Sequence, residues 1–321
     1  MHGNLPVPAS AGAMIPHVGD ALDRAAASFA SASKAWGTRV AYASDWRDFR
    51  AWCDAQAIDA LPADSRTVGR YLTHLAGLGL SVSTINRRCA AIASVHRAAG
   101  HDSPTGREDV RLIMAGIRNT LGRPPKKMQA LTVDLVSQVV RRIRGKGLVD
   151  LRDRALILLC FGAALRRSEL VGLEVGHLEF QRRGLMVRLH RSKTDQAGRG
   201  QSVAVLDGKL KTPAAIRAWL DAAGITEGPV FRGCDRGRVS PTHLTSGQFV
   251  RILKRRCEAA GLDPKAFSGH SPRRGYATTA GDAGADLRIT AKHMRHVKLE
   301  TTAGYIEDGD LFRQNAGASF M

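Results

Sequence analysis

One segment near the middle of the chain sets the strongest limit on its fold. Residues 121–131 (LGRPPKKMQAL) contain two consecutive prolines and three cationic side chains. Proline lacks an amide hydrogen and breaks the interior of a helix, so no helix continues through this segment. We therefore predict a linker at residues 121–131 that separates two domains. A length of 321 residues agrees with this division, because a domain usually has about 100–200 residues.

The first domain, residues 21–120, is predicted to be all helical. Its apolar residues recur every three or four positions, which places them on one face of a helix. This repeat occurs at residues 42–53, 68–75, 85–95 and 110–117. Ser65 is the predicted cap of the second helix. Residues 1–20 are rich in small residues and proline and have no such repeat, so we interpret them as a flexible tail.

The second domain, residues 132–321, mixes helices with a short β-hairpin. Residues 185–190 and 201–206 have the composition of strands, and a polar, glycine-containing stretch joins them. Helical patterns lie at residues 132–143, 155–164, 212–224 and 245–260 and from 272 onward. The predicted fold class is therefore mainly α with a small antiparallel β-sheet, as an N-terminal all-helical domain followed by a C-terminal mixed α/β domain.

The charge of the chain points to a polyanionic partner. Lys and Arg number 48 against 29 Asp and Glu, which gives a formal charge of +19. Both domains contribute, with 16 cations against 10 anions in residues 1–131 and 32 against 19 in residues 132–321. Neutralising phosphates releases counterions, so such a chain is expected to bind nucleic acid.

Other classes of protein are disfavoured by the composition. No apolar run approaches the ~20 residues of a membrane span, and the N-terminus lacks a secretory signal, so we expect a cytoplasmic protein with no membrane partner. The five cysteines form no C-x-x-C pair, which argues against both a disulfide framework and a cysteine zinc site. We predict no metal, no other cofactor and no small-molecule substrate.

Four short segments carry side chains suited to chemistry on a phosphate. They are ALRRSEL (164–170), RSKT (191–194), HSPRRG (270–275) and HVKLETTAGY (296–305). As a set, they resemble the catalytic pattern of the tyrosine site-specific recombinases of the phage integrase family. That pattern is an arginine, a lysine, His-x-x-Arg, a histidine or tryptophan, and a tyrosine near the C-terminus.

The resemblance covers about residues 20–316 and implies the fold of that family, with a helical core-binding domain and a catalytic domain. Three strings look most similar to the Cre recombinase branch: SGHSPR at 268–273, Trp-Cys at 52–53 and Tyr-Leu-x-x-Leu at 71–75. The implied activity is site-specific cutting and rejoining of DNA. Its biological task stays open among DNA integration, excision, plasmid dimer resolution and the movement of mobile elements.

Breaking a phosphodiester without a metal requires a nucleophile, cations for the pentacovalent phosphorane and an acid for the leaving oxygen. The resemblance implies that Tyr305 attacks the phosphate and forms a 3′-phosphotyrosyl intermediate. Arg166 and Arg273 suit the phosphorane because guanidinium stays charged and binds two phosphate oxygens at once. His296 is a candidate for a third donor.

The remaining candidates would move protons or orient the site. The resemblance implies that Lys193 is the general acid toward the 5′-oxygen, and His270 can hydrogen-bond the phosphate or accept the tyrosine proton. Glu169 lies three residues after Arg166 on one helical face and is predicted to orient that site and not to react. Arg274 directly follows Arg273, so a register in which Arg274 contacts the phosphate stays open. The spacing of three from His270 favours Arg273.

Two cationic domains predict a clamp around double-stranded DNA, with the linker crossing the duplex. Helices at 83–98 and 245–256 are the candidates for base and phosphate contacts. Their DNA-binding candidates are Asn86, Arg87, Arg88, Arg251, Lys254, Arg255 and Arg256. The first twenty residues are too short for an additional DNA-binding domain, so the resemblance implies a tetramer acting on short core sites, which we expect to be inverted repeats.

Three alternatives stay open at this point. A type IB topoisomerase or a hairpin telomere resolvase would use the same chemistry, and a DNA-binding relative without catalysis would share the fold. The complete set of catalytic candidates argues against the last. Sixteen residues follow Tyr305, and Leu311 and Phe312 among them predict docking on a neighbouring protomer or on the same chain.

Overall fold

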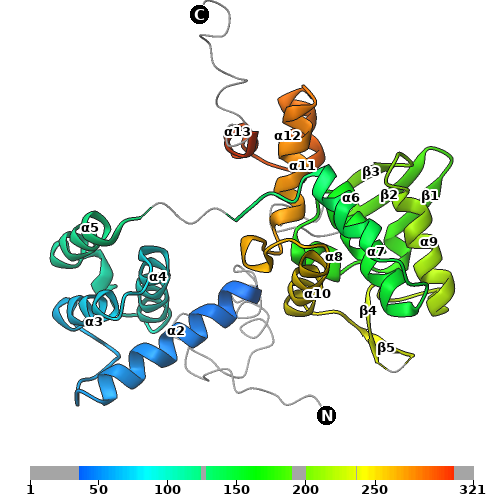
Figure 1. The fold of residues 1–321 in the computed structure, drawn as a ribbon. Helices are drawn as coiled ribbons and strands as arrows, with labels where there is room; N and C mark the ends of the chain where they lie inside the picture. Colours follow the sequence, from blue (N-terminus) through cyan, green and yellow to red (C-terminus); the bar gives the residue numbers. More distant parts are fainter. Residues whose placement is uncertain (1–35, 124–127, 190–199, 236, 307–321) are drawn as a thin grey trace, which may run out of the picture. The chain divides into compact units, whose positions relative to one another are not determined.

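The structure is a computed structural model that describes residues 36–123, 128–189, 200–235 and 237–306. It divides into two compact units, Met1–Pro125 and Lys126–Met321 (Figure 1). The division falls inside the segment predicted as a linker, and each unit has a hydrophobic core of its own. The predicted tail at residues 1–20 lies outside the described residues.

The N-terminal unit consists of helices, as its apolar repeats predict. They are α2 (Trp36–Asp54), α3 (Ser65–Gly77), α4 (Val82–Ala98) and α5 (Glu108–Leu121), with a 3₁₀ turn at Pro104–Gly106. The apolar faces meet in one core, where the rings of Phe49 and Tyr71 lie 4.9 Å apart. The Tyr71 hydroxyl donates to Asp48 of α2 at 2.6 Å, which joins α3 to α2 beside this core.

The start of α3 differs from the prediction by one residue. The cap is Asp64, whose carboxylate accepts from the amide of Thr67 at 2.7 Å, and Ser65 is the first helical residue. The Ser65 hydroxyl instead donates to Asp109 of α5 at 2.6 Å. Asp and Ser are both good caps, so the sequence alone does not choose between neighbours.

The C-terminal unit is built around one buried helix. Its helices are α6 (Val133–Arg142), α7 (Leu148–Gly162), α8 (Arg167–Val171), α9 (Thr212–Ala223), α10 (Ser246–Ala259), α11 (Ser271–Asp282), α12 (Leu287–Met294) and α13 (Leu299–Ile306). Residues 155–161 of α7 are all buried because that stretch is apolar on every side. Helices α6, α9, α10 and α11 pack against α7.

Short antiparallel sheets complete this unit. Strands β1 (Leu178–Gln181), β2 (Gly184–Leu189) and β3 (Gln201–Leu206) lie in that order, with Val187 opposite Val203. The predicted strand pair is confirmed, but the tip of its hairpin lies outside the described residues. Strand β1 and a second hairpin, β4 (Arg232–Asp235) with β5 (Arg238–His243), were not predicted. Their side chains are mostly exposed or half-buried, so they show no alternating apolar pattern.

The cysteines form no disulfide among the described residues. All five cysteines are free thiols, and Cys53, Cys160 and Cys257 are buried. Burial raises the pKa of the Cys53 and Cys257 thiols to about 11, so both stay protonated at neutral pH.

Within the described residues, no helix combines the length and the apolar character needed to cross a bilayer.

Candidate active site

The predicted catalytic residues lie on separate segments of the C-terminal unit. Arg166 directly precedes α8, and Arg273 lies in the first turn of α11. His296 stands between α12 and α13, and Tyr305 is in α13. Helix α11 contacts α7, α12 and α13, so the fold brings these segments together (Figure 1). Lys193 lies outside the described residues.

Arg166 and Glu169 form a largely buried ion pair. Nη1 of Arg166 donates to one carboxylate oxygen at 2.6 Å, and the Arg166 amide donates to the other at 2.8 Å. Burial alone would raise the pKa of Glu169, but the charges of Arg295 and Arg166 lower it below its ordinary value. Glu169 is therefore ionised at neutral pH and holds the Arg166 guanidinium in one orientation.

Arg273 is 3% exposed and belongs to the same cluster. Its guanidinium donates to the carbonyl oxygens of Ala164 and Met294. Burial, followed by the charges of Arg166 and Arg295, lowers the pKa of Arg273 to about 10, so it stays positively charged at neutral pH. Arg273 thereby joins the turn before Arg166 to the end of α12, which leads into His296.

Arg295 is a third arginine in this cluster, and its sequence context did not mark it as a candidate. It is 6% exposed, and its Nη2 donates to Glu169 at 2.9 Å and to the Ala164 carbonyl at 3.1 Å. Its only signal in the sequence is its place next to His296. Arginine is usually exposed, so nothing in the pattern predicts this burial.

His270 stands immediately before α11, three residues before Arg273. The residue is exposed, and partial desolvation of its ring together with the charges of Arg167, Arg273 and Arg166 lowers its pKa. The imidazole is therefore neutral at pH 7, a form in which one ring nitrogen can accept a proton.

His296 lies beside the predicted nucleophile. The ring centroids of His296 and Tyr305 are 5.8 Å apart, and Nδ1 of His296 shares a 2.7 Å hydrogen bond with the buried Thr302 hydroxyl. Burial, followed by the charges of the three neighbouring arginines, lowers the pKa of His296 to about 4. The bond to Thr302 leaves Nε2 of a neutral imidazole for a ligand.

Arg274 also lies near Tyr305. Its guanidinium carbon is 5.7 Å from the centre of the Tyr305 ring, within cation–π range, and it donates to the Met128 carbonyl. Arg273 contacts the cluster around Arg166, whereas Arg274 contacts the tyrosine ring and the start of the unit. This difference favours Arg273 as the partner of Arg166.

Tyr276 packs against the small apolar cluster of Ala164, Ala277 and Met294. Its ring stacks on His293 with centroids 4.3 Å apart and planes 9° from parallel. Nε2 of His293 donates to the Gly162 carbonyl at 3.0 Å, and burial is the main reason that the pKa of His293 falls to about 4. The stacked pair therefore supports the end of α7 just before the Arg166 turn.

The candidates on α4 divide into two kinds. Asn86 and Arg87 are exposed, although Arg87 donates to the buried Asp45 at 2.7 Å. Arg88 is 17% exposed, donates to the Tyr71 hydroxyl at 2.9 Å and pairs with Asp48. Arg88 thus joins α4 to α2 and α3, whereas Asn86 and Arg87 remain at the surface.

The candidates on α10 divide in the same way. Arg251 is exposed and Lys254 is half-buried. Arg255 and Arg256 both donate to the fully buried carboxylate of Asp153, at 2.8 and 2.7 Å. Only 16% of the Arg256 side chain is exposed, and this residue forms an internal ion pair with Asp153. Its contact with DNA stays a prediction.

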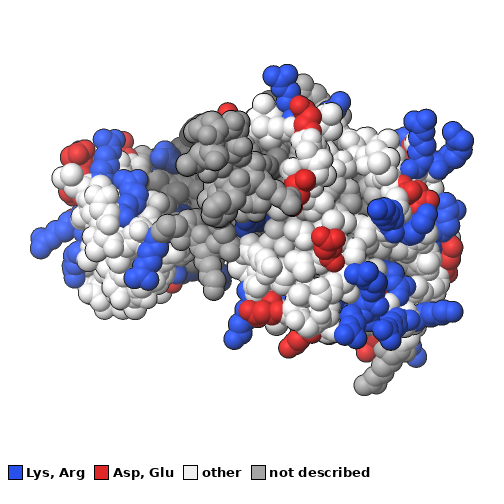
Figure 2. All heavy atoms as spheres, turned by 45° about the horizontal axis from the view of Figure 1, so that its top comes forward, with Lys and Arg blue, Asp and Glu red and all other residues white. Residues whose placement is uncertain are grey.

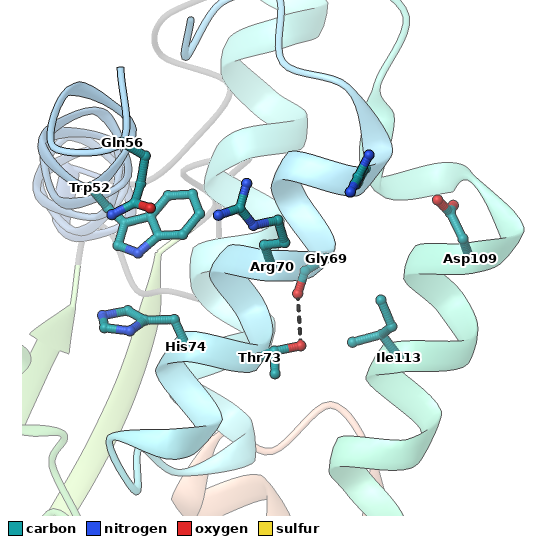
Figure 3. Close-up of a pocket in the computed structure, with 9 residues that line it drawn as sticks. Trp52, Gln56, Gly69, Arg70, Thr73, His74, Asp109 and Ile113 are labelled. Carbon is teal, nitrogen blue, oxygen red and sulfur yellow. Dashed lines mark hydrogen bonds between the residues drawn. The ribbon is translucent and has the colours of Figure 1, made fainter. Parts of the chain in front are cut away.

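The N-terminal unit has a hollow of its own. Figure 3 shows it between the end of α2, the exposed side of α3 and α5. Trp52 and His74 line one side with ring centroids 6.1 Å apart, and Arg66 and Arg70 add cations. All of its lining residues belong to the first unit, so this hollow is separate from the cluster around Arg166.

Each of the two units matches a known protein-family model. Residues 129–310 match the phage integrase family, and residues 31–102 match the phage integrase N-terminal SAM-like domain. The first match covers more than half of the chain.

Several curated proteins are similar over most of their length. An integrase/recombinase XerD homolog of Selenomonas ruminantium is 35% identical, over 88% of this chain and 85% of the relative. Tyrosine recombinase XerC of Corynebacterium efficiens is 29% identical, over 82% and 78%. Recombinase Cre of Escherichia phage P1 is 25% identical, over 82% and 86%.

Solved structures share the fold. XerH site-specific recombinase, bound to a palindromic difH substrate in a post-cleavage complex, has a TM-score of 0.58 at 16% identity and covers 81% of this chain and 72% of that one. A lambda integrase dimer bound to a COC′ core site has a TM-score of 0.58 at 14% identity, over 89% and 76%. These matches confirm the predicted fold class. The chain belongs to the phage integrase family of tyrosine recombinases, enzymes that break and rejoin DNA in site-specific recombination.

Proposed function

We propose that Tyr305 is the nucleophile of this recombinase and that Arg166, Arg273 and His296 bind the phosphate it attacks. One observation carries this proposal: segments far apart in the sequence converge at one place. Arg273 donates to the Ala164 carbonyl, and the His296 ring lies 5.8 Å from that of Tyr305. The charges of Arg166 and Arg273 also lie close enough to act on His296. A nucleophile beside fixed cations is the arrangement that phosphoryl transfer requires.

The reaction exchanges one phosphodiester bond for another. The Tyr305 oxygen forms a bond to phosphorus while the bond from phosphorus to the 5′-oxygen breaks. This leaves a 3′-phosphotyrosyl intermediate and a free 5′-hydroxyl. A 5′-hydroxyl from another strand then attacks the intermediate, which rejoins DNA and releases the tyrosine. Neither step uses a metal ion in this proposal.

Arg166 and Arg273 would bind the non-bridging oxygens of the phosphorane, where negative charge develops. Guanidinium groups suit this role because they stay charged and donate in a fixed fork. Nε2 of His296 would add a third donor. The ion pair with Glu169 supports this assignment because it holds Arg166 in one orientation before DNA binds.

Two side chains would move the protons. Lys193 would donate a proton to the leaving 5′-oxygen, a role that rests on the resemblance of RSKT at 191–194 to the family pattern. His270 would accept the proton of Tyr305. A neutral imidazole is needed for this, and the lowered pKa of His270 supports that state at neutral pH.

We propose that double-stranded DNA is held by both units, with Asn86 and Arg87 on α4 and Arg251 and Lys254 on α10 as contacts. Figure 2 supports a polyanionic partner, because Lys and Arg side chains stand out on the visible face of each unit. The XerH and lambda integrase structures are themselves complexes with DNA. Such an enzyme would work in the cytoplasm, where its DNA lies.

We further propose a tetramer that acts on a short core site built as an inverted repeat. The palindromic substrate of XerH supports the symmetry of the site. The tail with Leu311 and Phe312 lies outside the described residues, and its docking stays a prediction. Closer kinship with Cre is likewise only a prediction. The chain is 35% identical to a XerD homolog and 25% identical to Cre, which favours the XerD-like proteins instead.

Strand exchange tests this function against its alternatives. A site is first selected by binding of the protein to a random duplex library, and two DNA molecules that carry it are then incubated with the protein. Recombinant molecules with exchanged flanks are expected. Relaxation of a supercoiled plasmid without exchange would indicate a type IB topoisomerase, hairpin ends a telomere resolvase, and binding without cleavage an inactive relative.

A further inference from the structure

Arg295 has a backbone conformation that favours glycine. It follows α12 with φ 58° and ψ 44°, the left-handed region that is unfavourable for a residue with a Cβ atom. An arginine at such a position requires side-chain contacts that offset the free energy its backbone conformation costs.

The Arg295 side chain is 3% exposed, and both of its terminal nitrogens donate hydrogen bonds. Nη1 donates to the carbonyls of His293 at 2.9 Å and Ala163 at 3.2 Å. Nη2 donates to the Ala164 carbonyl at 3.1 Å and to Glu169 at 2.9 Å. These bonds join the segment that carries His296 to the turn that carries Arg166.

The charges of the cluster are unequal. Among the residues that the structure describes, three guanidinium groups, those of Arg166, Arg273 and Arg295, lie around one carboxylate, that of Glu169. One Glu169 oxygen accepts from the Arg166 side chain, and the other accepts from Arg295 and the Arg166 amide. Without Arg295, the full charge of Glu169 would act against that of Arg166, because low exposure reduces screening by water.

We propose that Arg295 is a positioning residue that neutralises Glu169, so that Glu169 can orient Arg166 without cancelling its charge toward the phosphate. This inference rests on the proposed role of Arg166. Glu169 and Arg295 then act together. The carboxylate of Glu169 orients Arg166, and the positive charge of Arg295 offsets the repulsion between that carboxylate and the phosphate.

The test measures two quantities. The first is the rate of cleavage of a nicked duplex, which traps the covalent complex, at saturating protein. The second is the affinity for DNA, measured in a separate titration. Arg295→Met keeps an unbranched apolar side chain at this position and removes the guanidinium group with its charge. We expect it to slow cleavage by about tenfold or more, which is about 1.4 kcal/mol in the barrier, and to change DNA affinity less. Arg288→Met is the matched control, because Arg288 is exposed on α12, and it should cleave at the native rate.

The double variant Glu169→Gln/Arg295→Met separates charge from structure. If Arg295 acts by neutralising Glu169, the double variant should cleave faster than Arg295→Met alone and at least about threefold faster than the product of the two single effects, in the manner of a double-mutant cycle. A purely structural Arg295 would make the double variant as slow as the product of the single effects, which would overturn the proposal. Native cleavage by Arg295→Met would overturn it equally.

Two further measurements keep the result interpretable. Thermal melting shows whether each variant is folded at the assay temperature. If Arg295→Met is not, Arg295→Lys decides, since it keeps the charge. A folded lysine variant should lose less than about tenfold in cleavage rate, and a loss of about tenfold or more would contradict the proposal. If the native protein forms no covalent complex, the proposed function fails, whereas equal complex formation by native protein and Arg295→Met defeats only this inference.

Discussion

The imidazole of His296 lies 5.8 Å from the ring of Tyr305 and is fixed by a 2.7 Å hydrogen bond to Thr302, one helical turn before the tyrosine. The donor and the nucleophile therefore share α13 as their support. A residue that orients a donor in this way affects the reaction without touching the phosphate.

Thr302→Val should slow cleavage by about tenfold because the His296 ring loses the partner that orients Nε2. DNA affinity should stay within about twofold, since Thr302 is buried away from the surface. Single-turnover cleavage with a separate binding titration checks this. Thr301→Val changes an exposed neighbour on the same helix and serves as the control; equal rates for both variants would contradict the role of the hydrogen bond.

Folding stability should fall as the pH drops from about 6.5 to about 4. His293 and His296 have pKa values of about 4 in the folded protein, whereas unfolded histidine titrates near about 6.5. Between these values the unfolded chain binds protons that the folded chain does not, so acid favours unfolding. Urea midpoints at about pH 7.5 and pH 5 measure the effect. The higher pH is the reference, because both histidines are neutral there in the folded and in the unfolded chain.

The variant His293→Phe should weaken that pH dependence. Phenylalanine can keep the stack on Tyr276 but has no group that titrates. Its midpoint near neutral pH should be lower than native, because the bond to the Gly162 carbonyl is lost. The difference in midpoint between neutral and acidic pH should shrink. An unchanged difference would show that burial of His293 is not a source of the acid sensitivity.

Substitutions at Asp153 and Arg251 should have different effects, the first on folding stability and the second on DNA binding. Asp153 is fully buried and accepts from Arg152, Arg255 and Arg256. Asp153→Ala should cost about 3–5 kcal/mol in the free energy of unfolding, because buried Arg152 loses its counterion. Arg251→Ala alters an exposed cation, so it should change stability by less than about 0.5 kcal/mol and reduce the salt dependence of DNA binding by about one phosphate contact. Urea unfolding and binding at several salt concentrations distinguish the two.

Gly275 lies where α11 crosses the start of the C-terminal unit. A Cβ atom at this position would lie 1.8 Å from the Leu131 carbonyl oxygen, so Gly275→Ala must displace backbone. We expect it to destabilise the unit by about 1–3 kcal/mol or more. Gly116, inside α5, has open space around it, and Gly116→Ala should be neutral or stabilising by up to about 1 kcal/mol. Equal unfolding midpoints for the two variants would contradict this packing.

The helices of the N-terminal unit are predictable from the sequence because their apolar residues keep the helical period: Phe49, Val68 and Ile85 are all buried. The helix α9 is predictable for a different reason, since Gly224 has the left-handed conformation that ends it. The β4–β5 hairpin is not predictable in this way. Its strands are exposed or half-buried throughout, so burial imposed no pattern on its sequence.

The candidate site divides along similar lines. Arg166, Arg273, His296 and Tyr305 can be proposed because their order and spacing resemble the catalytic pattern of the family. Arg295 cannot, because all of its hydrogen-bond partners except the nearby His293 carbonyl lie 126 to 132 residues earlier in the chain. For the same reason, the composition of α10 does not distinguish the buried pairing of Arg256 from the exposed Arg251.

The most direct test of the proposed mechanism uses a nicked duplex that carries the selected site and traps cleaved DNA on the protein. The protein is incubated with it in EDTA, and the attached peptide is mapped. The mechanism predicts DNA joined through a 3′-phosphate to Tyr305, and binding without attachment for Tyr305→Phe. Attachment to another residue, or attachment only when a divalent metal is supplied, would contradict it.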